Sequence, residues 1–129
     1  MRKIIIAGSA TFYKEAFNMK KELENKNYDV IDYPRNIDDS VEVEYKQAYE
    51  RFYESLSKTD DLLLLNLDKK GIEGYIGYES FAELSNLVVK KIQVNNDHKI
   101  YIYKMPSKEV GCYDEIMHFL ELGYIELYK

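Results

Sequence analysis

The chain has 129 residues, of which 46% are hydrophobic and 32% are charged, and its formal net charge at pH 7 is −5. This length fits one domain, residues 1–129, and the composition excludes a chain that is disordered throughout. The acidic balance argues against a nucleic-acid partner, because neutralising phosphates requires a basic face. Apolar runs are too short for a membrane span or a signal-peptide core, so we expect no membrane partner. The single cysteine, Cys112, cannot form an internal disulfide, which indicates a packed thiol in a cytoplasmic protein.

Short apolar runs alternate with longer segments of helical periodicity along the whole chain. The run at residues 4–7 stops at Gly8, which is typical of a strand buried on both faces. In the segment after it, Phe17 and Leu23 are expected to form the apolar face of a helix. In chain order, the predicted elements are a strand at residues 4–7, a helix at 13–26, a strand at 28–31, a loop at 34–40, a helix at 43–57, a strand at 62–65 that Asp61 opens and Asn66 ends, a glycine-rich loop at 71–77, a helix at 79–94, a strand at 99–103, a helix at 113–119 and a strand at 124–127.

This alternation predicts the fold class. Strand–helix repeats form βαβ units with right-handed crossovers, hence an α/β fold with a mostly parallel sheet. Five strands of this length predict a flavodoxin-like, Rossmann-like three-layer fold in the order 2-1-3-4-5, with residues 4–7 and 62–65 adjacent at the centre. In such sheets ligands bind beyond the carboxyl ends of strands 1 and 3.

Two segments are therefore candidates for a binding site. Gly8 and Ser9 follow the first strand and suit a phosphate or a sugar hydroxyl, although a short turn into a helix uses the same residues as caps. The second segment, which begins at Asn66, is longer than an ordinary strand–helix connection. Its Gly74 and Gly77 would let the backbone approach a ligand closely.

Glu79 and Glu83 are spaced i, i+4 just after that loop, so they share one face of the predicted helix. The positive end of the helix dipole favours ionised carboxylates there, and an ionised carboxylate can attack an anomeric carbon. A neighbouring carboxyl with a raised pKa could supply a proton. The alternative is a plain solvated face, because Phe81, Leu84 and Val88 form the apolar stripe on the other side.

Several of these segments together resemble the nucleoside 2-deoxyribosyltransferase-like superfamily, in particular its small members. The resemblance rests on Gly8-Ser9, on Asp61, and on residues 71–77 and 81–84. It implies the flavodoxin-like fold and cleavage of the N-glycosidic bond of a (2-deoxy)nucleoside or its monophosphate, by transfer or by hydrolysis. It also implies a homo-oligomer, at least a dimer, in which neighbouring subunits complete the pocket.

The resemblance assigns roles to single residues. Glu83 takes the place of the glutamate nucleophile, and Asp68 matches the aspartate that orients the sugar. The remaining candidates are Glu79 as a further catalytic residue and five substrate-binding residues. These five are Gly8, Ser9, Asn66, Gly74 and Gly77.

Other interpretations stay open. In a rival register Gly77-Tyr78-Glu79 matches the family motif, which would make Glu79 the nucleophile. After Glu83 the run Leu84-Ser85-Asn86-Leu87 stands where the family has glycine and alanine, which favours a binding module that has lost catalysis. A flavin-binding protein is a third alternative, suggested by Gly8-Ser9-Ala10-Thr11. A receiver domain is excluded because strand 3 ends in Asn66 instead of aspartate. We expect no cofactor, and no metal site, because the two histidines, His98 and His118, are isolated.

Overall fold

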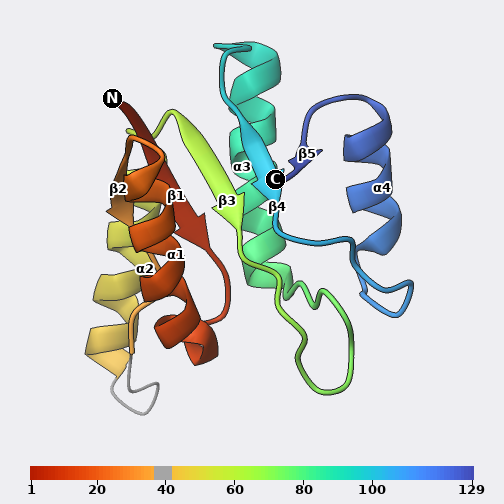
Figure 1. The fold of residues 1–129 in the computed structure, drawn as a ribbon, viewed down its shortest axis with the longest axis horizontal. Coiled ribbons are helices and arrows are strands. Elements are labelled where there is room, and N and C mark those ends of the chain that lie inside the picture. Colours follow the sequence, from red (N-terminus) through yellow and green to blue (C-terminus); the bar gives the residue numbers. More distant parts are fainter. Residues whose placement is uncertain (37–41) are drawn as a thin grey trace.

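The computed structural model describes residues 1–36 and 42–129, which form a parallel sheet with helices on both sides (Figure 1). In chain order its elements are β1 (Arg2–Ala7), the 3-10 helix η1 (Ala10–Phe12), α1 (Tyr13–Asn25), β2 (Tyr28–Asp32), α2 (Glu42–Leu56), β3 (Asp61–Leu64), α3 (Tyr78–Gln93), β4 (Ile100–Ile102), α4 (Tyr113–Glu121) and β5 (Glu126–Leu127). The strand order is β2-β1-β3-β4-β5 and every pairing is parallel, so the predicted fold class is confirmed. The two apolar runs predicted at the centre are neighbours, with Ala7 opposite Leu64.

The central strands are buried on both faces because their side chains alternate between two cores. Ile4 and Ile6 of β1 point to the side that α1 covers, where Leu23 packs against them. Ile5 and Ala7 point to the opposite side, which α2, α3 and α4 cover. These four side chains are fully buried, which explains why the run is continuously apolar instead of alternating.

The helix boundaries agree with the sequence prediction to within two residues, with two differences in detail. The first helix is preceded by η1, which the sequence did not indicate; Ser9 caps it by accepting a hydrogen bond from the Thr11 backbone N–H. Phe17, expected on the apolar face of α1, is 44% exposed, so that expectation is wrong. The apolar face of α1 is made by Ala16, Met19 and Leu23 instead. Of the loop expected at residues 34–40, positions 37–40 lie outside the described residues.

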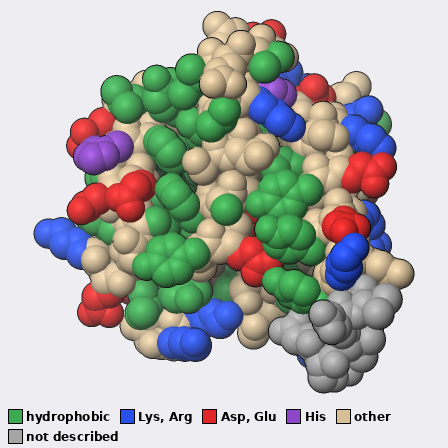
Figure 2. Space-filling view, turned by 180° about the vertical axis from the view of Figure 1, so that it is seen from behind, with side chains coloured by type: hydrophobic (Ala, Val, Ile, Leu, Met, Phe, Trp, Pro, Cys, Tyr) green, Lys and Arg blue, Asp and Glu red, His purple; other side chains and the backbone are tan. Residues whose placement is uncertain are grey.

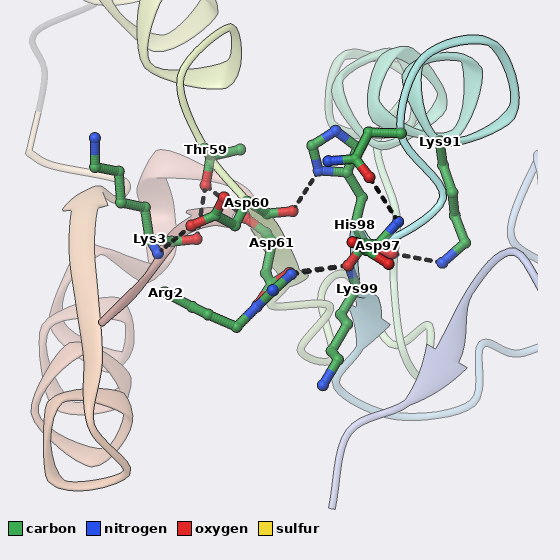
Figure 3. Close-up of polar contacts among 10 residues, drawn as sticks. Arg2, Lys3, Thr59, Asp60, Asp61, Lys91, Asp97, His98 and Lys99 are labelled. Atoms are coloured by element: carbon green, nitrogen blue, oxygen red, sulfur yellow. Dashed lines mark hydrogen bonds and ion pairs between the residues drawn. The ribbon is translucent and has the colours of Figure 1, made fainter.

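A polar network holds the strands together at their amino ends (Figure 3). The guanidinium of Arg2 on β1 donates two hydrogen bonds, of 2.9 and 2.6 Å, to the carboxylate of Asp61, which is completely buried. Asp61 also accepts the backbone N–H of Lys99, just before β4, at 2.9 Å. His98 Nδ1 lies 2.6 Å from the carbonyl oxygen of Asp60. Asp61, one of the residues on which the family resemblance rests, therefore holds β1, β3 and β4 together. It does so at the amino ends of the strands, opposite the end where the ligand site is expected.

Candidate functional site

A cavity of about 430 Å³ lies at the carboxyl ends of β1 and β3, where the strand order reverses. Its walls come from the turn after β1, the segment after β2, the inner side of α2, and the start of α3. Of the residues predicted from the sequence, Gly8, Ser9, Gly77, Glu79 and Glu83 line this one cavity. Its volume is in the range of small-molecule sites in other proteins.

Glu83 lies in the second turn of α3 and is only 9% exposed. Burial raises its pKa to about 8, and the nearby negative charges of Glu79 and Asp32 raise it further. No hydrogen bond from a described residue offsets this burial. The expectation that the helix dipole keeps Glu83 ionised is therefore wrong. The alternative of a solvated face is wrong at Glu83 as well, whereas Glu79 is exposed as that alternative requires. Desolvation outweighs the dipole because Glu83 lies past the first turn, where the dipole acts most strongly.

Glu79 lies in the first turn of α3, one helical turn before Glu83. It is exposed, and its carboxylate accepts a 2.6 Å hydrogen bond from the hydroxyl of Tyr45 on α2. This bond joins α2 to the first turn of α3 beside the cavity that both residues line. The two glutamates therefore share a cavity but not an environment: one is buried and protonated near neutral pH, and the other faces water.

The turn after β1 forms a polar wall of the cavity. Ser9 Oγ accepts a 3.0 Å hydrogen bond from the ammonium group of Lys69, a residue of the loop that follows β3. The same ammonium group lies 5.6 Å from the ring centroid of Tyr75. Gly8 brings the backbone close to β3, where an added Cβ atom would lie 3.1 Å from the carbonyl oxygen of Leu65. The ammonium group of Lys69, a residue that the sequence did not single out, therefore lies beside the predicted pair Gly8-Ser9.

Asn66 lies outside the cavity lining and serves the loop itself. It is buried, and its side-chain oxygen accepts backbone N–H bonds from Tyr103 and Lys104, while its amide group donates to the carbonyl oxygens of Lys104 and Gly74. Gly74 is also buried; its φ is 61°, and an added Cβ atom would lie 2.7 Å from the carbonyl oxygen of Met105. These two candidates fasten the long loop to the segment after β4.

Asp68 is placed on the outer side of the same loop, away from the cavity lining. Its carboxylate accepts a 2.9 Å bond from the Gly74 backbone N–H and a 2.8 Å bond from the Lys104 ammonium group. These two hydrogen bonds, that of Lys104 first, lower the pKa of Asp68. The structure thus brings Glu79 and Glu83 together and places Asp68 apart from them.

Aromatic side chains make up much of the remaining cavity wall. Tyr45, Tyr49 and Tyr53 follow one another along α2, with ring centroids 6.2 and 5.1 Å apart. Tyr45 and Tyr49 line the cavity, as do Tyr75 and Tyr78 from the other side. Such rings offer flat surfaces for an aromatic ligand. Figure 2 shows hydrophobic side chains gathered over the side of the molecule that α2, α3 and α4 form.

Two arginines that the sequence reading missed also line the cavity. Arg35 follows β2 and Arg51 lies on α2, and both approach the buried carboxylate of Asp32, at 3.9 and 3.7 Å. Asp32 is the last residue of β2. An acidic residue at the end of a strand is the sequence signal that could have pointed to this part of the site. The sequence gives no sign that two arginines 16 positions apart meet there.

Within residues 1–36 and 42–129, no group of three or more His, Cys, Asp or Glu side chains is arranged to hold a metal ion. In the same part of the chain no helix combines the length and the apolar character needed to cross a membrane. Cys112 directly precedes α4 and is buried, and burial raises the pKa of its thiol to about 11. A buried thiol that holds its proton so firmly is a packing group and a poor nucleophile.

Comparisons of the chain with protein-family models, with curated protein sequences and with solved structures find no match. The resemblance to nucleoside 2-deoxyribosyltransferase-like proteins therefore rests on the short motifs described above. The function has to be argued from the cavity and its side chains.

Proposed function

We propose that the protein cleaves the N-glycosidic bond of a (2-deoxy)nucleoside or a nucleoside monophosphate, with Glu83 as the nucleophile. The observation that carries this proposal is the pair of carboxyl groups, Glu79 and Glu83, in one aromatic-lined cavity at the switch point of the sheet. Glycosidic cleavage uses two carboxyl groups, and this cavity holds one that is buried and one that is exposed. The aromatic rings of α2 suit the flat base of such a ligand.

The proposed reaction has two steps. In the first, a carboxylate oxygen of Glu83 bonds to the anomeric carbon while the bond from that carbon to the base nitrogen breaks. The bonding electrons leave with the base, which takes up a proton from Glu79 or from water. In the second, water or another base attacks the anomeric carbon and releases Glu83.

Glu83 must lose its own proton before it can attack. Its pKa is about 8, so only a minor fraction of Glu83 is ionised at neutral pH. The alternative assignment exchanges the roles, so that Glu83 donates the proton and Glu79 attacks. We keep Glu83 as the nucleophile because the motif resemblance places it there, and the pH dependence described in the Discussion separates the two assignments.

A second candidate function is ligand binding without catalysis. It is favoured by the run Leu84-Ser85-Asn86-Leu87, which follows Glu83 where the family has glycine and alanine. Leu87 is fully buried, so this departure lies in the packing of the helix that carries the nucleophile. In this case the same cavity would bind a nucleotide-like ligand and leave it unchanged.

The test is incubation of the protein with deoxynucleosides and their 5′-monophosphates, followed by chromatographic detection of the released base. We expect release of base from at least one compound, at a rate that is proportional to protein concentration. Binding of a compound without release of its base would favour the binding module over the enzyme.

We also propose that the protein is a homo-oligomer, most simply a dimer. Tyr45 and Tyr49 are 39% and 41% exposed on α2, and Tyr78 at the start of α3 is 74% exposed, so large rings face solvent in one chain. Exposed aromatic surface of this kind is typical of interfaces. We expect light scattering at micromolar concentration to give at least twice the mass of 15.3 kDa, and the mass of a single chain would contradict the proposal.

A cytoplasmic location is part of the same proposal. The single cysteine is buried and has no second cysteine with which to form a disulfide within the chain, so an oxidising compartment would not stabilise the fold.

A further inference from the structure

Arg35 stands where two hollows of the surface meet. The first is the cavity that holds Glu79 and Glu83, and the second is a more open hollow of about 530 Å³ between α1 and the segment after β2. Both are lined by Tyr33, Pro34 and Arg35. The Arg35 guanidinium lies 4.7 Å from the ring centroid of Tyr33, which supports it from one side. A group bound by Arg35 would therefore be within reach of both hollows.

The second guanidinium at this place belongs to Arg51 on α2. Both arginines form ion pairs with Asp32. The distances, 3.9 Å from Arg35 Nη2 and 3.7 Å from Arg51 Nε to the carboxylate oxygens, are too long for hydrogen bonds. Asp32 is already satisfied by the Ser55 hydroxyl at 3.0 Å and by the backbone N–H of Tyr33 at 2.9 Å. No hydrogen bond among the described residues uses either guanidinium, so their planar sets of N–H donors remain available.

The charges around this place leave a positive excess. Two guanidinium groups face a single carboxylate, and Asp32 is 1% exposed while the arginine side chains are 45% and 47% exposed. Lys69 adds a third cation to the cavity wall. The negative groups of the cavity, Glu79 and Glu83, stand on α3, and Glu83 is largely protonated at neutral pH.

We propose that Arg35 and Arg51 form a binding site for a phosphate group at the junction of the two hollows. Two half-exposed guanidinium groups with unused donors match the geometry of a phosphate, which takes paired N–H bonds from arginine. As part of the substrate this phosphate would rest on the proposed function, and it would make the monophosphate the preferred form. Binding of phosphate itself does not depend on that function.

Titration calorimetry on the Glu83→Gln variant tests the site without consuming the ligand. The probes are inorganic phosphate, deoxyadenosine and deoxyadenosine 5′-monophosphate. We expect the monophosphate to bind about 10- to 100-fold more tightly than the nucleoside, the usual strength of charge-assisted hydrogen bonds. Replacing Arg35 or Arg51 by glutamine should remove most of that difference while leaving nucleoside affinity unchanged.

The matched control is Lys108→Gln, which makes the same change in net charge at an exposed position outside both hollows. It should keep the full difference in affinity. Arg51→Lys retains the charge without the planar donors and should lose most of the difference, so it serves as well if a glutamine variant fails to fold. Equal affinity for nucleoside and monophosphate, or a difference that survives in the arginine variants, would overturn the proposal.

A further probe, a 3′–5′ dinucleotide of deoxyadenosine, distinguishes the two possible sources of the phosphate. Binding tighter than the monophosphate would assign a bridging phosphate whose second nucleoside lies in the hollow beside α1. Equal or weaker binding would assign a terminal phosphate. Failure of this site and failure of the proposed function give different results. If base is released equally from nucleoside and monophosphate, only the proposal of the phosphate site is contradicted. If affinity depends on the phosphate but no base is released, only the proposed enzymatic function is contradicted.

Discussion

Replacing Glu83 by glutamine is expected to lower the rate of base release by roughly three to six orders of magnitude. Each tenfold loss corresponds to about 1.4 kcal/mol, so the activation barrier rises by roughly 4–8 kcal/mol. The amide of glutamine has the size of the carboxyl group but cannot form the glycosyl ester, so the covalent step is lost while the packing is kept. Rates are measured as released base with the best compound of the panel, and circular dichroism confirms that the variant is folded.

Two other glutamates serve as controls for this variant. Glu79→Gln should cost only about 10²-fold, because Glu79 assists proton transfer and water can partly replace it. Glu73→Gln should leave the rate unchanged, since Glu73 is exposed in the loop and does not line the cavity. An inactive Glu79 variant beside a mildly affected Glu83 variant would show that the rival register is correct.

The activity should rise with pH until about pH 8. The pKa of Glu83 is about 8, because burial and the charges of Glu79 and Asp32 disfavour the carboxylate. If the carboxylate is the attacking form, kcat/KM falls about tenfold for each pH unit below that value, because kcat/KM follows ionisation of the unliganded enzyme. The measurement is kcat/KM from pH 5 to 10. A profile that falls above pH 8 instead would make Glu83 the proton donor.

The same ionisation must appear in the free energy of unfolding. The folded protein holds the Glu83 proton up to about pH 8, whereas the unfolded chain releases it near pH 4.5. Below pH 4.5 Glu83 is protonated in both states and does not lower the free energy of unfolding. This free energy then falls as the pH rises from 4.5 to about 8. Glu83→Gln lacks this cost and should be more stable than the wild type by about 2–4 kcal/mol above pH 8. Urea unfolding of both proteins at pH 4 and pH 9 measures the effect, and equal stability at pH 9 would refute the raised pKa.

The fold could be predicted from the sequence because its strongest signals are local. The continuous apolar runs in β1 and β3 are typical of strands buried on both faces, and the helices between the strands indicate the crossover pattern. The position of the site at the carboxyl ends of these strands follows from the strand order alone. For this reason the sequence suffices to assign Gly8, Ser9, Glu79 and Glu83 to one place.

The chemistry of that place could not be predicted, because it depends on which element packs against which. Glu83 falls on the edge of the polar side of α3 when the helix is considered alone, and it becomes buried because the site is enclosed by other elements, including α2. Asp68 follows a strand that leads to the site, yet its partner Lys104 lies 36 positions away and holds it outside. Arg35 and Arg51 meet at Asp32 only through the packing of α2 on β2.

The tyrosines around the cavity have an optical consequence. The chain contains 13 tyrosines and no tryptophan, so its ultraviolet emission comes from tyrosine alone. Tyr33, Tyr45, Tyr49, Tyr75 and Tyr78 line the cavity, so a bound aromatic ligand would touch five of the 13 fluorophores. In most proteins energy transfer to tryptophan would hide such a change. Here the cavity wall itself is the natural reporter of occupancy, and no label has to be attached.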